Sequence, residues 1–419
     1  MVTVSNMVTR QKPAEATRPR GGGRLVAGGL LAAGALVLAG AAADFSLGQA
    51  AGRDTAGVLA ALRPDEPARL IELALQDLAR NPARPIASRE IAAARAHLAV
   101  RPLDPQALVL LGLAADARAP GGTAASPFMQ LANRISRREP VSQIWMIEAA
   151  SASGDVPQAL RHYHTVLSTN PELFDLLAPV LVKAIDFPEV QKALRPYVRD
   201  DVAWMTNFLP YAAANGRLDS TLAMIGPHHA VLRRKAYDPI TPEFTRRLAR
   251  AGRGDEALAF ARRVHGDFQP AAFRSFAPSP ASADARLGVL AWTPAQEGGV
   301  QSEIGESGDV RVTVDPGASG IALSREFLSD LSARDRLSHR LVFDPGQRPD
   351  AIEWRGSCAE DGRPARSWSA RVPIRPGASS QALPAGLLAS CRLVRFELHV
   401  FGKDGQLPAT FTLSDIALD

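Results

Sequence analysis

The sequence contains none of the short motifs that mark common catalytic sites. It has no Gly-x-Ser-x-Gly segment for a nucleophilic serine, and the glycine run at residues 21–23 is followed by no Lys-Ser or Lys-Thr pair. That run precedes an apolar segment instead of joining a strand to a helix, so it is no phosphate-binding loop. Aspartate and glutamate are scattered as solvated helix faces. We therefore predict no enzyme activity, no catalytic residue and no cofactor.

Histidine is scarce, with eight residues in a chain of 419, and its spacing argues against a metal centre. His162 and His164 are the most metal-like pair, but side chains two residues apart on a helix point about 200° away from each other. Ligation from one helical face requires a spacing of three or four residues. His228 and His229 follow a Gly-Pro turn and offer at most an opportunistic site. We predict no metal ligands.

The chain also lacks a strong charge excess outside its first residues. Of the formal net charge of +5, residues 1–24 contribute +4, from five basic residues and one acidic residue. The remainder is near neutral, whereas nucleic-acid binding uses a concentrated positive field. We predict no nucleic-acid partner, and we expect residues 1–24 to form a disordered basic tail in the cytoplasm.

One long apolar run interrupts this otherwise mixed sequence. Residues 25–43, LVAGGLLAAGALVLAGAAA, form a stretch of 19 residues without a polar side chain. At about 1.5 Å per residue such a helix just spans a hydrocarbon core of about 30 Å. Because the basic residues before it should stay inside, the chain that follows should be translocated. We predict a single-pass bacterial inner-membrane protein whose bulk lies in the periplasm.

The end of this run leaves a second interpretation open. The small residues at 41–43 satisfy the rule for a signal-peptidase site, so cleavage before Asp44 would release a soluble chain. The long basic region before the run and its full length favour an uncleaved transmembrane helix.

Only two cysteines occur, Cys358 and Cys391, and both lie in the C-terminal region. In an oxidising periplasm they would close a loop of about 34 residues and constrain the unfolded chain by about 3–4 kcal/mol. The alternative is a pair of buried free thiols. We predict the disulfide, which fits translocation.

Residues 53–268 contain successive amphipathic segments of helical period, separated by proline, glycine, asparagine and aspartate. Examples are residues 67–80, 88–100, 105–117, 142–153 and 156–169. A glycine turn recurs, because Gly154-Asp-Val-Pro-Gln-Ala159 matches Gly252-Arg-Gly-Asp-Glu-Ala257 in spacing. These repeats predict antiparallel neighbouring helices.

The segment from Pro140 to Pro171 resembles one tetratricopeptide (TPR) repeat. The resemblance implies a TPR-like α-helical solenoid, in which small residues let two helices cross closely and a concave surface binds protein partners. A generic α-helical bundle is the alternative. The residues that the alignment assigns to repeat packing are Met146, Ile147, Ala150, Gly154, Ala159, Tyr163, Gly252 and Ala257.

The pattern changes near residue 269. Residues 269–283 are rich in proline, serine and alanine, which predicts a linker. Residues 284–419 contain about seven short alternating or β-branched runs, of which 409–418 is the last. They predict an antiparallel β-sandwich or jelly-roll domain.

Aromatic and cysteine landmarks follow in the order Leu290-Ala-Trp292, Ile352-Glu-Trp354-Arg-Gly-Ser-Cys358 and Cys391-Arg-Leu-Val-Arg-Phe396. This order resembles that of carbohydrate-binding-like jelly-roll domains. The resemblance implies a glycan-facing domain. Trp292, Trp354 and Trp368 are the candidate glycan contacts, because aromatic faces stack on sugar rings. Tryptophan within a strand more often belongs to a core, and that alternative stays open.

The sequence therefore predicts a multidomain α + β chain: an N-terminal transmembrane helix, a TPR-like α-solenoid and a C-terminal antiparallel β-sandwich. The functional hypothesis is a non-catalytic, membrane-anchored scaffold or adaptor. It would bind protein partners of the cell envelope during synthesis or export of a cell-surface polysaccharide (exopolysaccharide). The alternative is a glycan-binding or carbohydrate-active protein that acts through its C-terminal domain.

Overall fold

A computed structural model describes residues 67–120, 123–296, 298–329, 334–362, 366–384, 390–405 and 407–419. The chain divides between Gly226 and Pro227 into two compact units, which are described separately. The predicted basic tail and the apolar segment 25–43 lie outside the described residues. Among the helices that are described, none has the length and apolar character needed to cross a membrane.

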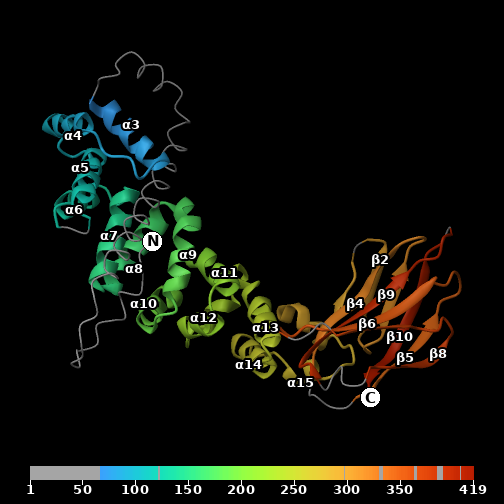
Figure 1. The fold of residues 1–419 in the computed structure, drawn as a ribbon. Helices are drawn as coiled ribbons and strands as arrows, with labels where there is room; N and C mark the ends of the chain where they lie inside the picture. Colours follow the sequence, from blue (N-terminus) through green and yellow to red (C-terminus); the bar gives the residue numbers. More distant parts are fainter. Residues whose placement is uncertain are drawn as a thin grey trace, which may run out of the picture. The chain divides into compact units, whose positions relative to one another are not determined.

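The first unit is built from helices joined by short turns (Figure 1). Proline stands in the first turn of several of these helices, where its missing N–H group leaves no hydrogen bond unmade. The helices are α3 (Pro67–Arg80), α4 (Ser88–Val100), α5 (Pro105–Arg118), α6 (Ser126–Ile135), α7 (Pro140–Ser153), α8 (Val156–Thr169), η2 (Pro171–Leu173), α9 (Phe174–Ala184), α10 (Pro188–Arg199), α11 (Met205–Asn215) and α12 (Leu218–Ile225).

Helices α7 and α8 form a helix–turn–helix within the segment that resembles a repeat, and they pack against each other (Figure 1). Gly154 ends α7 in the left-handed region with φ of 77°, and the Asp155 side chain caps α8 by accepting from the N–H of Gln158. The five non-glycine residues assigned here to repeat packing are all buried, namely Met146, Ile147, Ala150, Ala159 and Tyr163. Membership of the tetratricopeptide family stays a prediction.

The second unit starts with helices and ends in a β-sandwich. Its helical elements are η3 (His229–Arg233), η4 (Lys235–Tyr237), α13 (Ile240–Arg250), α14 (Gly254–Val264), α15 (Pro270–Arg274), η5 (Ala281–Ala283) and η6 (Ala285–Leu290). Its strands are β1 (Thr293–Pro294), β2 (Val300–Ile304), β3 (Val310–Val314), β4 (Ser319–Leu328), β5 (Arg336–Phe343), β6 (Ala351–Cys358), β7 (Ser367–Arg371), β8 (Gly377–Ala382), β9 (Leu393–Phe401) and β10 (Ala409–Leu418).

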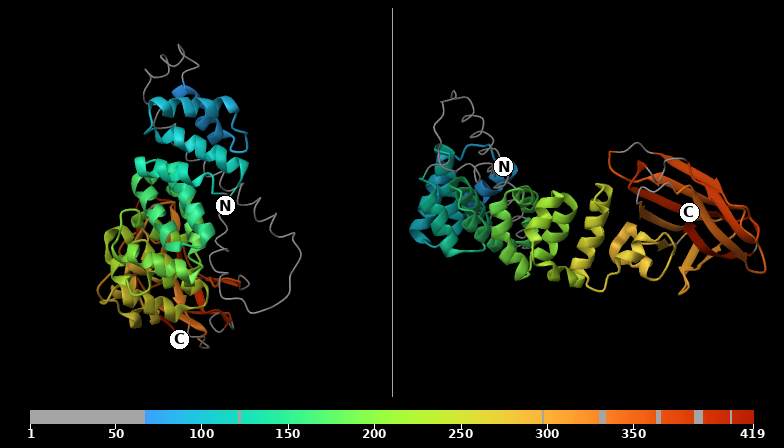
Figure 2. Two further views of the ribbon diagram at one scale, coloured as in Figure 1. Left: turned by 90° about the vertical axis from the view of Figure 1, so that its left-hand side faces the viewer. Right: turned by 90° about the horizontal axis from the view of Figure 1, so that it is seen from below.

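The strands form two antiparallel five-stranded sheets that lie face to face, orange and red in Figure 2. We call them the β9 sheet, with the order β1-β4-β9-β6-β7, and the β10 sheet, with the order β2-β3-β10-β5-β8. Alternate residues of each strand point inward, so Phe396 and Leu398 of β9 and Phe411 and Leu413 of β10 are fully buried. The predicted antiparallel β-sandwich is confirmed.

The segment 269–283 is not the linker that its composition predicts. It contains helix α15, and its residues Phe273 and Phe276 are buried. The ring of Phe276 lies edge to face against those of Trp292, Phe327 and Phe396, inside the sandwich core. Proline and serine here shape a segment that packs on the sheets.

The boundary between the compact units therefore lies after Gly226, and not near residue 269 as the sequence predicted. Helix α13 packs against η6, where a Cβ atom on Gly288 would come within 2.9 Å of Pro242. Gly252 and Ala257, which the alignment assigned to a solenoid repeat, consequently belong to the C-terminal unit.

The predicted disulfide between Cys358 and Cys391 is confirmed. It connects the end of β6 to the residue that precedes β9 by two positions. Within this loop lie β7 and β8, the edge strands of the two sheets.

Replacing both cysteines by serine should destabilise the C-terminal unit by about 3–4 kcal/mol, because the unfolded chain regains the freedom of the open loop. Chemical denaturation followed by circular dichroism measures the change in the free energy of unfolding. The reduced wild-type protein, which also lacks the bond, is measured beside the serine variant. The β-sheet signal should melt earlier while the helical signal of the first unit is retained. Equal stability of oxidised, reduced and serine-substituted chains would show that the bond constrains nothing.

Ala159→Leu should overpack the contact between α7 and α8 and cost about 1–3 kcal/mol, because the small side chain is 3% exposed. The matched control is Ala152→Leu, the same substitution at an exposed position of α7. In thermal melting of the full chain, the transition of the helical unit should occur at a lower temperature in Ala159→Leu and at an unchanged temperature in the control. Similar melting of both variants would mean that Ala159 tolerates bulk and that the tight crossing was wrongly inferred.

Candidate functional site

The outer face of the β9 sheet carries rows of charged and polar side chains that cross its strands. Strand alternation places Glu353, Arg355 and Ser357 of β6 outward, since Ile352 and Trp354 between them are buried. Each outward residue of β6 stands opposite an outward residue on both neighbouring strands. The face is therefore organised by cross-strand pairs.

Opposite charges meet in these rows. Arg355 lies between Glu397 of β9 and Ser369 of β7, and Glu353 lies between His399 and Arg371. Pairs of opposite charge directly across an antiparallel ladder stabilise the sheet, while like charges would weaken it.

Several of these side chains are held by direct contacts. Arg355 donates to Glu353 at 3.0 Å, and His399 Nε2 lies 2.9 Å from Glu397. The hydrogen bond from Arg355 lowers the pKa of Glu353, so this carboxylate is ionised at neutral pH. These contacts bring hydrogen-bond donors and acceptors together on the outer face of the sheet.

A hollow of about 440 Å³ lies on this face, over β6, β7 and β9. Its lining combines two carboxylates, two guanidinium groups and three serine hydroxyls. The lining residues are Glu353, Arg355, Gly356, Ser357, Ser367, Trp368, Ser369, Arg395 and Glu397. Hydrogen-bond donors and acceptors are thus presented together without net charge.

Two of the three tryptophans predicted as glycan contacts lie elsewhere. Trp292 is 1% exposed and Trp354 is 0% exposed, so both rings belong to the sandwich core and cannot form an exposed platform. Trp368 stands on the edge strand β7, half-buried, where it packs on the core and also lines the hollow. The alternative interpretation of strand-embedded tryptophan as core residues holds for the first two.

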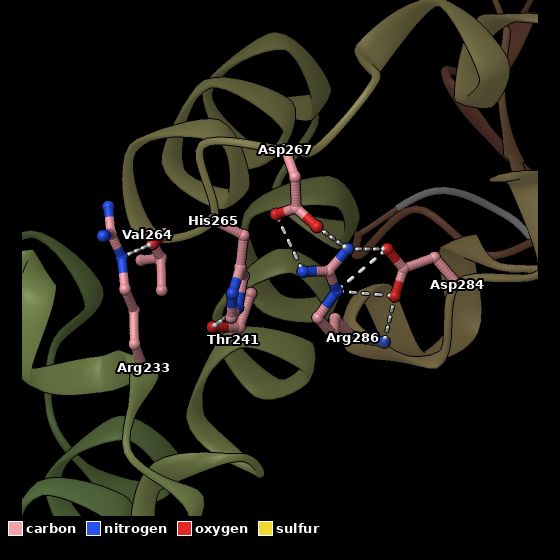
Figure 3. Close-up of polar contacts among 7 residues, drawn as sticks. All are labelled: Arg233, Thr241, Val264, His265, Asp267, Asp284 and Arg286. Carbon is pink, nitrogen blue, oxygen red and sulfur yellow. Dashed lines mark hydrogen bonds and ion pairs between the residues drawn. The ribbon is translucent and has the colours of Figure 1, made fainter.

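The polar network in Figure 3 joins the helical part of the C-terminal unit. Arg286 of η6 contacts Asp284 and Asp267, the latter at 3.0 Å in the turn after α14. The hydrogen bond from Arg286 lowers the pKa of Asp267. Beside them, His265 lies 3.3 Å from the hydroxyl of Thr241, and Arg233 donates to the carbonyl of Val264. These contacts hold neighbouring turns together and occupy polar groups that a ligand would otherwise need.

The histidines considered in the sequence have separate partners. His162 Nδ1 lies 2.7 Å from Oε1 of Gln143, whereas His164 Nδ1 accepts from Nε1 of Trp204 at 3.0 Å. His229 packs edge to face against Phe260. No group of three or more potential metal ligands occurs within the described ranges.

A histidine is also buried between the two sheets. His339 of β5 is 1% exposed, and in the described part of the chain neither ring nitrogen has a hydrogen-bond partner. Its ring lies 6.4 Å from that of Trp354, whose Nε1 is likewise unpartnered. Burial lowers the pKa of His339 to about 4, so the folded unit keeps this ring neutral.

Comparison with family models and with curated proteins finds no match for this sequence. Among solved structures, the chain is similar to the enzymatically active domain of bacteriophage CBA120 tailspike protein 4, with 9% identity and a TM-score of 0.21. That match covers 30% of this chain and 18% of the tailspike chain. A structure titled "CBM4 structure and function" matches with 9% identity and a TM-score of 0.21, over 32% of this chain and 81% of that one. Neither similarity assigns a role to any residue.

The C-terminal unit should lose stability as the pH falls from about 6.5 to about 4, because the unfolded state protonates His339 and the folded state resists it. The direction of the change follows from the lowered pKa of His339. Its contribution to the free energy of unfolding is fully present above the pKa of the unfolded state, about 6.5, and decreases as the pH falls below that value. This histidine contributes about 3 kcal/mol over that range. His339→Leu should flatten the profile, measured by denaturant unfolding at several pH values. Identical pH profiles for both chains would contradict this role.

Proposed function

We propose that this protein is a non-catalytic glycan-binding protein whose β-sandwich holds a polysaccharide on the outer face of the β9 sheet. The observation that carries the proposal is the neutral, polar hollow of about 440 Å³ over β6, β7 and β9. Such a lining suits a ligand that is uncharged and rich in hydroxyl groups.

The chemistry of the lining supports this ligand class. A sugar hydroxyl both donates and accepts a hydrogen bond, and the hollow offers carboxylate acceptors, guanidinium donors and serines that do both. Hydrogen bonds to charged groups are the stronger ones.

The state of the carboxylates favours binding over hydrolysis. Glycoside hydrolysis uses two carboxyl groups, one of which must be a proton donor with a raised pKa. Arg355 lowers the pKa of Glu353, so this residue is a poor proton donor. We therefore assign Glu353 to ligand binding, and the proposal keeps the protein non-catalytic.

A scaffold role for the helical unit remains part of the proposal. Val100 and Leu103, at the end of α4 and in the turn after it, are 81% and 71% exposed, and such apolar side chains favour contact with a protein partner. The apolar segment 25–43 supports membrane anchoring, and the disulfide supports an oxidising compartment such as the periplasm. A membrane-anchored adaptor that holds a cell-surface polysaccharide during its synthesis or export fits these features.

Isothermal titration of the full chain with neutral hexasaccharides, such as cellohexaose, laminarihexaose and maltohexaose, tests the binding site. Arg355→Ala should lower the affinity for whichever hexasaccharide binds by about tenfold or more, because a hydrogen bond from a charged group is lost. The matched control is Arg311→Ala on the outer face of the β10 sheet, which also removes an exposed arginine paired with one carboxylate.

Binding should persist unchanged in Arg311→Ala. The site is refuted if both variants lose affinity alike, or if none of the sugars binds at millimolar concentration. Release of shorter sugars during the titration would instead contradict the non-catalytic part of the proposal.

A further inference from the structure

Arg395 of β9 lines the hollow on the β9 sheet, but its anionic partner does not. Both carboxylates of the lining pair with side chains of the same open face. Arg395 instead donates through Nη2 to Oε1 of Glu326 at 2.7 Å. Glu326 lies directly opposite it on the neighbouring strand β4 and is not part of the lining. One of the two guanidinium groups of the hollow is therefore held from outside it.

Glu326 is a buried anchor for this arginine. Its side chain is 2% exposed, and the same oxygen also accepts from Nη2 of Arg250 in α13 at 2.8 Å. Hydrogen bonds between a guanidinium group and a carboxylate are strong and geometrically specific. Glu326 is consequently attached both to the sheet and to a helix, while the side chain of Arg395 is 42% exposed.

The bond to Glu326 leaves a pair of donors on Arg395 unused. A guanidinium group carries five N–H donors in one plane, and each of its two edges offers two parallel N–H groups. Because Nη2 contributes one hydrogen to each edge, donating one of them leaves the other edge complete. Among the described residues the guanidinium group of Arg395 makes no further hydrogen bond. A ligand in the hollow can therefore meet two parallel donors.

The neighbours of Arg395 within the lining are hydroxyl groups. Ser357 of β6 stands directly opposite Arg395, and Ser367 of β7 stands opposite Ser357. The carboxylate in this row, Glu326, is buried. In the adjacent row, by contrast, an arginine stands opposite a carboxylate of the lining. The row of Arg395 thus presents donors to oxygen atoms of a ligand.

We propose that Arg395 recognises two neighbouring hydroxyl groups of one sugar ring and that Glu326 positions it, an inference that rests on the proposed glycan-binding function. The two parallel N–H groups of the unused edge suit two oxygen atoms that lie side by side. The bond to Glu326 restricts the guanidinium group, so less rotational freedom is lost when the sugar binds. Glu326 is thus a positioning residue that acts through Arg395.

This recognition specifies how the sugars of the ligand are linked. In cellohexaose and maltohexaose, each internal ring keeps two free hydroxyl groups on neighbouring carbons. In laminarihexaose, the glycosidic bond occupies the carbon between the two remaining ring hydroxyls, so an internal ring has no free neighbouring pair. The ligand class is therefore a polysaccharide whose linkages leave two adjacent ring hydroxyls free in each sugar.

Isothermal titration of the full chain with these three hexasaccharides tests the specificity. The chain should bind cellohexaose or maltohexaose about tenfold more tightly than laminarihexaose, because the paired hydrogen bonds from a charged group form only with neighbouring hydroxyls. Arg395→Lys keeps the charge beside Glu326 but loses the planar fork. It should lower the affinity for the preferred hexamer to that for laminarihexaose.

A double-mutant cycle tests the positioning role. Glu326→Leu should lower the affinity for the preferred hexamer about tenfold and remove the linkage preference, because Arg395 loses its anchor. Since Glu326 acts through Arg395, the double variant Glu326→Leu with Arg395→Lys should bind no more weakly than Arg395→Lys alone. The matched control, Asp344→Asn, removes the carboxylate that pairs with Arg311 of the β10 sheet and should change neither affinity nor preference.

The possible outcomes separate this inference from the proposed function. Equal affinity for all three hexamers overturns the recognition of neighbouring hydroxyls and leaves glycan binding intact. A loss in Glu326→Leu that is equal for all three hexamers, or that adds to the loss in Arg395→Lys, shows a general loosening of the sheet and overturns the positioning role. Binding of none of the hexamers refutes the proposed function itself.

A second variant covers the case in which Glu326→Leu does not fold. Glu326→Gln then takes its place in the cycle, because it keeps the shape of the side chain and weakens the bond to Arg395 by removing the charge. A linkage preference that survives in both Glu326→Gln and Arg395→Lys overturns the proposal.

Discussion

The guanidinium group of Arg325 lies inside the C-terminal unit, and the arrangement of that unit depends on it. It donates to the carbonyl oxygens of Leu290, Ser275 and Phe273, and it lies within 6 Å of the ring centres of Phe273, Trp292 and Phe327. Within the described residues no carboxylate contacts it, so backbone dipoles and aromatic faces replace water around a buried cation. Because the carbonyl groups of Phe273, Ser275 and Leu290 solvate this charge, Arg325 holds the segment 273–290 against the sandwich.

The two cavities of this unit use charge in different ways. On the sheet face, arginines stand opposite carboxylates on neighbouring strands, and the lining of the hollow carries no net charge. In the cavity of about 790 Å³ beside the turn Gly252-Arg253-Gly254, Arg253 pairs with Glu256 and Arg274 pairs with Asp255. Glu326 lies between them, buried against two arginines, and removing it would leave opposing positive charges at the junction.

Sequence patterns predicted the elements whose limits are set locally. The ranges of α3, α4, α8 and β10 follow from apolar periodicity and from proline, glycine and aspartate at their ends. The sequence pattern did not predict β4, because charged residues such as Arg325 and Glu326 are typical of exposed loops. Both are buried here, and only partners far away in the sequence make that burial favourable. It also took 269–283 for a linker, since composition cannot reveal that Phe276 enters a core made from later strands. The polar face of the β9 sheet could not be predicted from the sequence for the same reason. Its rows join residues about 40 positions apart, and the register that pairs them is a tertiary property.

The disulfide between Cys358 and Cys391 also restricts how this chain can associate with copies of itself. It closes a covalent ring that contains β7 and β8, the outermost strands at one edge of each sheet. Edge strands are the elements that molecules most readily exchange or pair with a neighbour. The bond keeps the two ends of this segment together, so an oxidised molecule cannot extend it into the open chain that favours strand exchange between molecules. Oxidation therefore opposes exchange of these two edge strands between molecules.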